Sequence, residues 1–82
     1  MDKVTDVLEL CTGSGCLAIM AAEVFQLAHV DAIDIDEDAL AVAGINVAQY
    51  ELQERISLIQ SDLYHAVPAD KKYDIVFTNP PY

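Results

Sequence analysis

The chain of 82 residues has few basic side chains and no tryptophan. Only 4 Lys and Arg stand against 14 Asp and Glu, which gives a net charge of −10. Nucleic-acid binding surfaces depend on basic patches, so this balance argues against direct contact with a phosphate backbone. It fits a soluble protein, and it permits a basic protein or a cationic small molecule as a partner.

Cysteine and histidine are also scarce, which limits metal chemistry. Cys11 and Cys16 lack the C-x-x-C spacing of zinc sites, and the two histidines, His29 and His65, lie far apart in the sequence. We therefore expect no metal site, and reduced thiols in a cytoplasmic protein. The first residues lead into a strand-like segment rather than a signal peptide, and no apolar run is long enough to span a membrane.

Strand-like and helix-like stretches alternate along the chain. Short apolar runs predict four strands, and longer stretches rich in Ala and Leu predict two helices. The order β-α-β-α-β-loop-β predicts one α/β unit with a mostly parallel, open sheet and right-handed crossovers. The expected strands span residues 4–10, 29–35, 56–60 and 73–78, and the expected helices span 16–26 and 37–51.

The second predicted helix has a clear start and an apolar face. Asp36 is a good N-cap, because its side chain can accept hydrogen bonds from the free N–H groups of the first turn. Leu40, Ala43, Val47 and Tyr50 recur at helical spacing. This spacing places the four side chains on one face of the helix.

A glycine turn joins the first strand to the first helix. Gly13-Ser14-Gly15 lets the backbone turn tightly and approach a ligand, and the helix N-terminus presents free N–H groups. With Ala18 in the third place, the turn also satisfies the dinucleotide fingerprint, although a purely structural turn is the alternative. If the glycines serve ligand approach, Gly15→Val should abolish binding while leaving the helical content nearly intact.

Acidic residues follow or end the predicted strands. Asp34 ends the second strand about 20 residues after Gly13, where such folds hydrogen-bond a ribose diol. Asp31 is expected on the opposite face or in solvent. Asp62 follows the third strand and could accept from the amino group of a base, or be an ordinary loop acid. Glu9, under the glycine turn, could face a cationic part of a cofactor or hold the loop.

The chain ends on Asn79-Pro80-Pro81-Tyr82, directly after the fourth predicted strand. The two prolines fix φ and carry no N–H, so nearby carbonyls and the Asn79 amide form a cluster of acceptors. Such a cluster suits a planar NH₂ group, on which Tyr82 could stack. A proline-terminated turn is the alternative.

Together these segments resemble class I S-adenosylmethionine-dependent methyltransferases. The resemblance rests on four stretches, and within the class it points to the protein-(glutamine-N5) methyltransferase family, in which Asp is commoner than Glu at the position of Glu9. It implies a Rossmann-like methyltransferase core over residues 1–82, which we expect to be truncated and inactive alone. The four stretches are Val7–Cys16, Val30–Asp34, Gln60–Leu63 and Asn79–Tyr82.

The resemblance implies a role for each motif residue and a protein substrate. Asn79 and Pro80 would accept the two N–H bonds of a glutamine amide, and Tyr82 would pack on its plane. The implied substrate is ribosomal protein L3, with peptide-chain release factors as the second choice. The residues implied to bind S-adenosylmethionine are Glu9, Thr12, Gly13, Ser14, Gly15, Asp34, Asp62, Leu63 and Asn79.

Three other functions use parts of the same pattern. A nicotinamide-dependent dehydrogenase would share Gly13, Gly15 and Asp34 but leaves the ending Asn79–Tyr82 without a role. A nucleic-acid amino methyltransferase would share that ending, since adenine N6 is also a planar NH₂, but it conflicts with the acidic charge. A fragment that binds cofactor without catalysis is the third.

Overall fold

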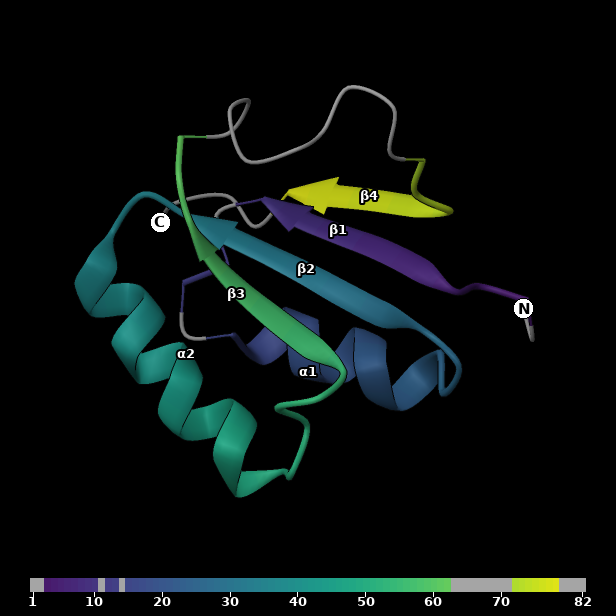
Figure 1. Cartoon of the computed structure of the whole chain (residues 1–82), viewed down its shortest axis with the longest axis horizontal. Coiled ribbons are helices and arrows are strands. Elements are labelled where there is room, and N and C mark those ends of the chain that lie inside the picture. Colours follow the sequence, from purple (N-terminus) through teal and green to yellow (C-terminus); the bar gives the residue numbers. More distant parts are fainter. Residues whose placement is uncertain (1–2, 11, 14, 63–71, 79–82) are drawn as a thin grey trace.

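The computed structural model describes residues 3–10, 12–13, 15–62 and 72–78. Along them the order of elements agrees with the prediction, and most predicted elements are one or two residues too long (Figure 1). The strands are β1 (Asp6–Leu10), β2 (His29–Asp34), β3 (Ile56–Gln60) and β4 (Ile75–Thr78), and the helices are α1 (Cys16–Val24) and α2 (Glu37–Gln49).

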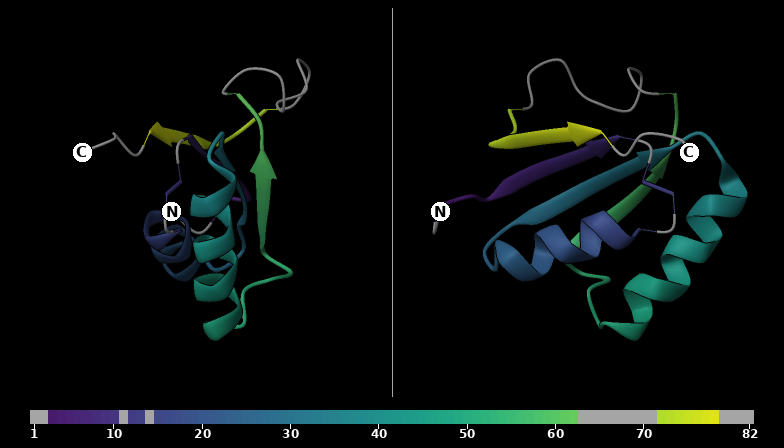
Figure 2. Two further views of the ribbon diagram at one scale, coloured as in Figure 1. Left: turned by 90° about the vertical axis from the view of Figure 1, so that its left-hand side faces the viewer. Right: turned by 180° about the vertical axis from the view of Figure 1, so that it is seen from behind.

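The described strands form one parallel sheet in the order β3-β2-β1-β4. Both helices cover the same face of this sheet (Figure 2). That arrangement follows from two successive right-handed crossovers that step in the same direction, from β1 to β2 and from β2 to β3. The carboxyl ends of all four strands therefore meet at one edge, which confirms the predicted α/β architecture.

The core between helices and sheet is built largely from small side chains. Ala18 and Ala22 of α1 and Ala32 of β2 are fully buried, together with Val7 and Val30. Alanines let the helix lie close to the strands, so the layers pack densely although the chain is short. The third position of the glycine fingerprint, Ala18, thus serves this close packing.

The helix α2 begins as its sequence predicts but ends earlier. The Asp36 carboxylate caps it by accepting the N–H of Asp38 at 2.9 Å. Ala43 and Val47 face the core, whereas Tyr50 is 57% exposed. The helix stops at Gln49, so Tyr50 lies just beyond the apolar face that the sequence predicts.

Arg55, just before β3, closes the open end of α1. Its guanidinium donates to the carbonyls of Ala22 (2.7 Å), Phe25 (2.8 Å) and Ala28 (3.0 Å). The last carbonyls of a helix lack intrahelical partners and carry partial negative charge, so a cation there satisfies both needs. Arg55 thereby fastens α1 to the loop that leads into β3.

Candidate functional site

The predicted site residues that the structure describes gather at the carboxyl edge of the sheet. Thr12 and Gly13 follow β1, Asp34 ends β2, and Asp62 lies two residues beyond β3. Backbone hydrogen bonds tie these segments together, from Thr12 N–H to Ile33 O (3.0 Å) and from Ser61 N–H to Asp34 O (3.1 Å). The parallel sheet thus brings together residues from three separate parts of the chain.

Asp34 is the centre of this edge. Its Oδ2 accepts the N–H of Gly13 at 2.9 Å, and its Oδ1 accepts the N–H of Asp36 at 3.0 Å. The carboxylate therefore fixes both the glycine turn and the start of α2. Its two oxygens can accept about four hydrogen bonds in all, so Asp34 can hold the turn and also accept from the hydroxyls of a ligand.

Glu9 lies beneath the turn and is fully buried. Its Oε1 accepts the hydroxyl of Thr12, whereas its Oε2 has no hydrogen-bond partner among the described residues. Burial raises the pKa of Glu9 to about 6; the bond from Thr12 opposes the rise, and the charge of Asp34 adds to it. Thr12 is also buried, and its hydroxyl donates to Glu9 in the interior of the protein.

The glycines of the turn have different structural roles. Gly13 (φ 59°) and Gly15 (φ 84°) both adopt the left-handed conformation. A Cβ on Gly15 would lie 3.1 Å from the Cβ of Ala43 in α2, which is tighter than an ordinary contact. Gly15→Val would therefore strain the contact between the turn and α2, and its expected effects on binding and helical content remain predictions.

Some predicted site residues lie outside the described part of the chain. They are Ser14, Leu63, Asn79, Pro80 and Tyr82. Their assigned roles remain predictions from the sequence.

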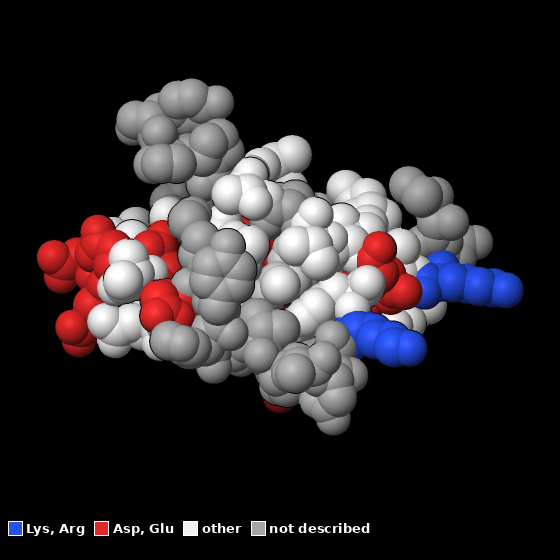
Figure 3. Space-filling model, turned by 90° about the horizontal axis from the view of Figure 1, so that it is seen from above, with Lys and Arg blue, Asp and Glu red and all other residues white. Residues whose placement is uncertain are grey.

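Acidic side chains gather at one end of the molecule. Figure 3 shows a group of Asp and Glu side chains at the end where α2 begins, whereas the Lys and Arg side chains in this view lie at the opposite end, beside a smaller group of acidic ones. Asp36, Glu37 and Asp38 are all exposed at the acidic end. The candidate edge thus carries a negative field, which favours cationic ligands.

Asp31 takes part in a second polar cluster on the sheet face away from the helices. It accepts the hydroxyl of Tyr73 at 2.7 Å and lies 3.3 Å from His29 Nε2, which is also 2.8 Å from Ser57 Oγ. Asp31 is buried, so only the opposite-face alternative for it holds. Both contacts of His29 use one ring nitrogen, whereas a Ser-His-Asp relay needs two, so this cluster lacks triad geometry.

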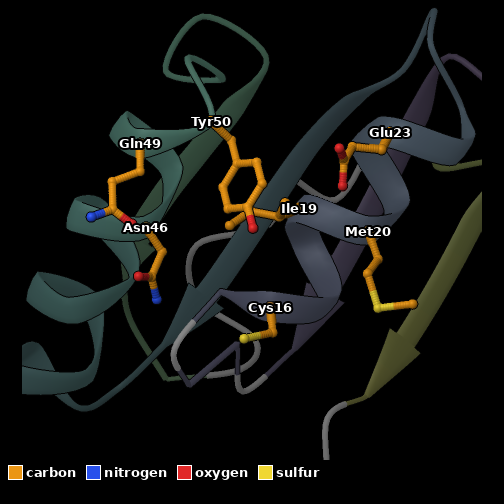
Figure 4. Close-up of a pocket in the computed structure, with 7 residues that line it drawn as sticks. All are labelled: Cys16, Ile19, Met20, Glu23, Asn46, Gln49 and Tyr50. Carbon is orange, nitrogen blue, oxygen red and sulfur yellow. The ribbon is translucent and has the colours of Figure 1, made fainter.

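A groove of about 300 Å³ lies between the two helices (Figure 4). None of the described site residues lines it, so it is separate from the candidate edge. Its lining side chains are Cys16, Ile19, Met20, Glu23, Asn46, Gln49 and Tyr50.

The described residues lack both a metal-binding cluster and a membrane-spanning helix. These residues contain no group of three or more His, Cys, Asp or Glu side chains that could hold a metal ion. No helix among them has both the length and the apolar character needed to cross a membrane.

Two features of the site were not evident from the sequence. Ala43 was predicted only as part of an apolar face, yet it packs against the turn residue Gly15. The complete burial of Glu9 was also missed. The alternation of Val7 with Glu9 was a usable signal, because residues two apart in a strand face the same side and Val7 is a core residue.

Comparisons with known proteins point to one family. The chain is 54% identical over 80 residues to the ribosomal protein uL3 glutamine methyltransferase of Bordetella pertussis strain Tohama I, with 98% of this chain and 26% of that protein covered. It is 55% identical over 87 residues to the protein of the same name in Burkholderia pseudomallei strain K96243, with 99% and 28% covered. The chain thus spans about a quarter of the length of these relatives.

Solved structures and a family model agree with these relatives. A Staphylococcus aureus structure provisionally named as a caffeoyl-CoA O-methyltransferase is 26% identical with a TM-score of 0.79, covering 93% of this chain and 37% of that one. The family model described as the methyltransferase small domain matches residues 1–82. On this evidence the chain, with its parallel sheet and its glycine turn held by Asp34, belongs to the methyltransferase small domain family.

Proposed function

We propose that residues 1–82 form the S-adenosylmethionine-binding core of a protein-glutamine N5-methyltransferase that modifies ribosomal protein L3. The observation that carries the proposal is the identity of 54–55% to two relatives named as ribosomal protein uL3 glutamine methyltransferases. The acidic charge of −10 is compatible with a basic protein substrate. We place the reaction in the cytoplasm, as the sequence leads us to expect.

The candidate edge has suitable groups for this cofactor. Asp34, at the end of β2, would accept from the ribose hydroxyls while it holds the Gly13 turn. Asp62, just beyond β3, would accept from the amino group of the adenine. The buried Oε2 of Glu9, which has no donor among the described residues, suits a site for a ligand with positive charge.

The cofactor supplies an electrophilic methyl group when it is bound. The chain has to orient the acceptor, because the nitrogen of an amide is a poor nucleophile and positioning therefore supplies much of the rate. We assign this task to Asn79 and Pro80, whose oxygens would accept the two N–H bonds of the glutamine amide and stabilise positive charge that develops on its nitrogen. Tyr82 would pack on the amide plane.

Binding can be tested on the chain itself by isothermal titration calorimetry. We expect S-adenosylmethionine and S-adenosylhomocysteine to bind and NAD not to bind. Asp34→Asn should weaken the binding of S-adenosylmethionine, because it removes the negative charge at the end of β2. Asp38→Asn removes the same charge from the exposed first turn of α2 and should leave the affinity nearly unchanged. Preferential binding of NAD would contradict the proposal and favour a dehydrogenase.

Catalysis is best tested within a full-length relative, because the chain spans about a quarter of the length of these relatives. A chimera in which residues 1–82 replace the matching segment of the Bordetella pertussis relative should methylate L3, as detected by the mass of one added methyl group on a glutamine. Asn79→Ala in the chimera should lower kcat by about 10²–10³-fold, the scale for one preorganised polar partner. Cofactor affinity should change little. A chimera that binds cofactor but leaves L3 unmodified would contradict the assigned substrate.

A further inference from the structure

The carboxyl group of Glu9 is unusual because only half of it has a partner. The side chain is fully buried, and its Oε1 accepts the hydroxyl of Thr12. The other oxygen, Oε2, has no donor among the described residues. A buried carboxylate oxygen without a donor is costly, and the cost falls if the group is protonated or if a cation lies close to it.

The surroundings of Glu9 make the ionised form still less favourable. Asp34, at the end of the adjacent strand β2, contributes a second negative charge and raises the pKa of Glu9. The described residues of β4, on the other side of β1, contribute no titratable or charged group. The titratable groups of α1 are Cys16 at its first position and Glu23 in its last turn, and both are exposed. Within the described residues, therefore, no cation compensates Glu9.

Glu9 and Asp34 hold two successive residues of the same turn. Glu9 accepts from the side chain of Thr12, and Asp34 accepts from the backbone N–H of Gly13. A ligand held at this turn would lie near both carboxyl groups. If that ligand is cationic, it supplies the positive charge that the protein itself does not provide there.

We propose that Glu9 holds a proton in the ligand-free chain and releases it when a cationic ligand occupies the Gly13 turn. This inference rests on the proposed function, and the ligand is a sulfonium compound such as S-adenosylmethionine. On release the O–H bond of the carboxylic acid breaks, and the proton passes to the solvent. Glu9 is then a positioning residue whose charge appears only in the loaded site, opposite the ligand.

The direct measurement is the pH titration of the Glu9 side-chain carbonyl ¹³C shift by NMR. In the free chain we expect the midpoint at a pH of about 6, the raised pKa of Glu9. Asp34→Asn should lower that midpoint, because it removes the neighbouring negative charge while an oxygen remains to accept from Gly13. Asp38→Asn is the matched control and should leave it in place. Saturating S-adenosylmethionine should lower the midpoint by about one pH unit or more.

Isothermal titration calorimetry measures the release of the same proton independently. Titrations at a pH of about 6 in buffers of different ionisation enthalpy should show release of about 0.4 proton per bound S-adenosylmethionine if the pKa falls by about one unit. S-adenosylhomocysteine lacks the sulfonium charge, so it should release less. In Glu9→Gln the difference between the two ligands should vanish.

The possible outcomes separate this inference from the proposed function. Tight binding of S-adenosylmethionine without proton release, or release that persists in Glu9→Gln, would overturn the inference and leave the proposed function standing. A free-chain midpoint at the ordinary value for Glu would also overturn it. Failure to bind S-adenosylmethionine at all would overturn both proposals.

Discussion

The contact between Gly15 and Ala43 allows a sharp test of how the glycine turn is held. Gly15 has φ 84°, and a Cβ built on it would lie 3.1 Å from the Cβ of Ala43 and 3.4 Å from its Cα. Gly15→Ala therefore adds a left-handed alanine, which costs about 1–2 kcal/mol. It also adds a methyl group to a tight contact, for which overpacking costs are about 1–3 kcal/mol. We expect a total loss of about 2 kcal/mol or more in the free energy of unfolding.

A double-mutant cycle separates the two costs. Ala43→Gly alone should cost about 1 kcal/mol, the helix propensity difference between the two residues. It also removes the methyl group that the new Cβ would meet. In Gly15→Ala/Ala43→Gly the steric cost of the new alanine is relieved. The backbone cost of Gly15→Ala and the helix propensity cost of Ala43→Gly remain. The double mutant should therefore be more stable than the sum of the single effects by at least about 0.5 kcal/mol.

Urea denaturation followed by circular dichroism measures all four free energies. The neighbouring glycine of α2 provides a matched control, because a Cβ on Gly44 meets only Leu58 Cδ1 at 3.8 Å. Gly44→Ala should therefore stabilise the chain by about 1 kcal/mol through helix propensity. If Gly15→Ala is as stable as the parent, the packing role of Gly15 is refuted. Additive effects within about 0.3–0.5 kcal/mol would mean that only the backbone matters.

Three further predictions concern ionisable side chains. Arg55→Lys should lower the free energy of unfolding by about 1–3 kcal/mol in urea denaturation, because one ammonium cannot reproduce the hydrogen bonds of the guanidinium to three carbonyls. An unchanged urea midpoint would contradict the role of Arg55 in fastening α1. Hydrogen bonds from the backbone of Thr5 and Asp6 lower the pKa of Asp74 from its ordinary value of 3.8. The parent chain should therefore lose stability as the pH falls below 3.8, and acid denaturation of Asp74→Asn should lack this loss. The raised pKa of Glu9 means that the folded chain binds more protons than the unfolded chain between pH 4.5 and about 6. The free energy of unfolding should therefore fall by about 2 kcal/mol as the pH rises through that window. Thermal melts of Glu9→Gln should not show this fall.

The architecture could be predicted because its signals are local. Apolar runs of strand length alternate with helix-length stretches, and alternation of that kind leaves few topologies open. The cap of α2 by Asp36 was also predictable, since capping depends on a residue and its next two or three neighbours. Element ends were less accurate because the last turn of a helix depends on tertiary contacts, as with Tyr50 at the end of α2.

The details of the site depend on contacts between distant segments. The position of Asp34 near Gly13 followed from a known spacing, but its direct hold on the Gly13 amide did not. The hydrogen bond from Arg55 to the carbonyl of Ala22 joins residues 33 positions apart, and no local sequence pattern predicts it. The burial of Glu9 depends on how β1 sits between β2 and β4 beneath the turn.

Asp34 shows why structural and binding roles are hard to separate at this edge. Three backbone donors reach it, since Gly13 N–H binds Oδ2, Asp36 N–H binds Oδ1 and Ser61 N–H binds the backbone carbonyl. The first two hold the glycine turn and the start of α2, and the third holds the exit of β3. A substitution that removes both side-chain oxygens would loosen the turn as well as any ligand contact. Asparagine keeps one oxygen in place and changes the charge, so Asp34→Asn is the substitution that tests binding with the least disturbance to the turn.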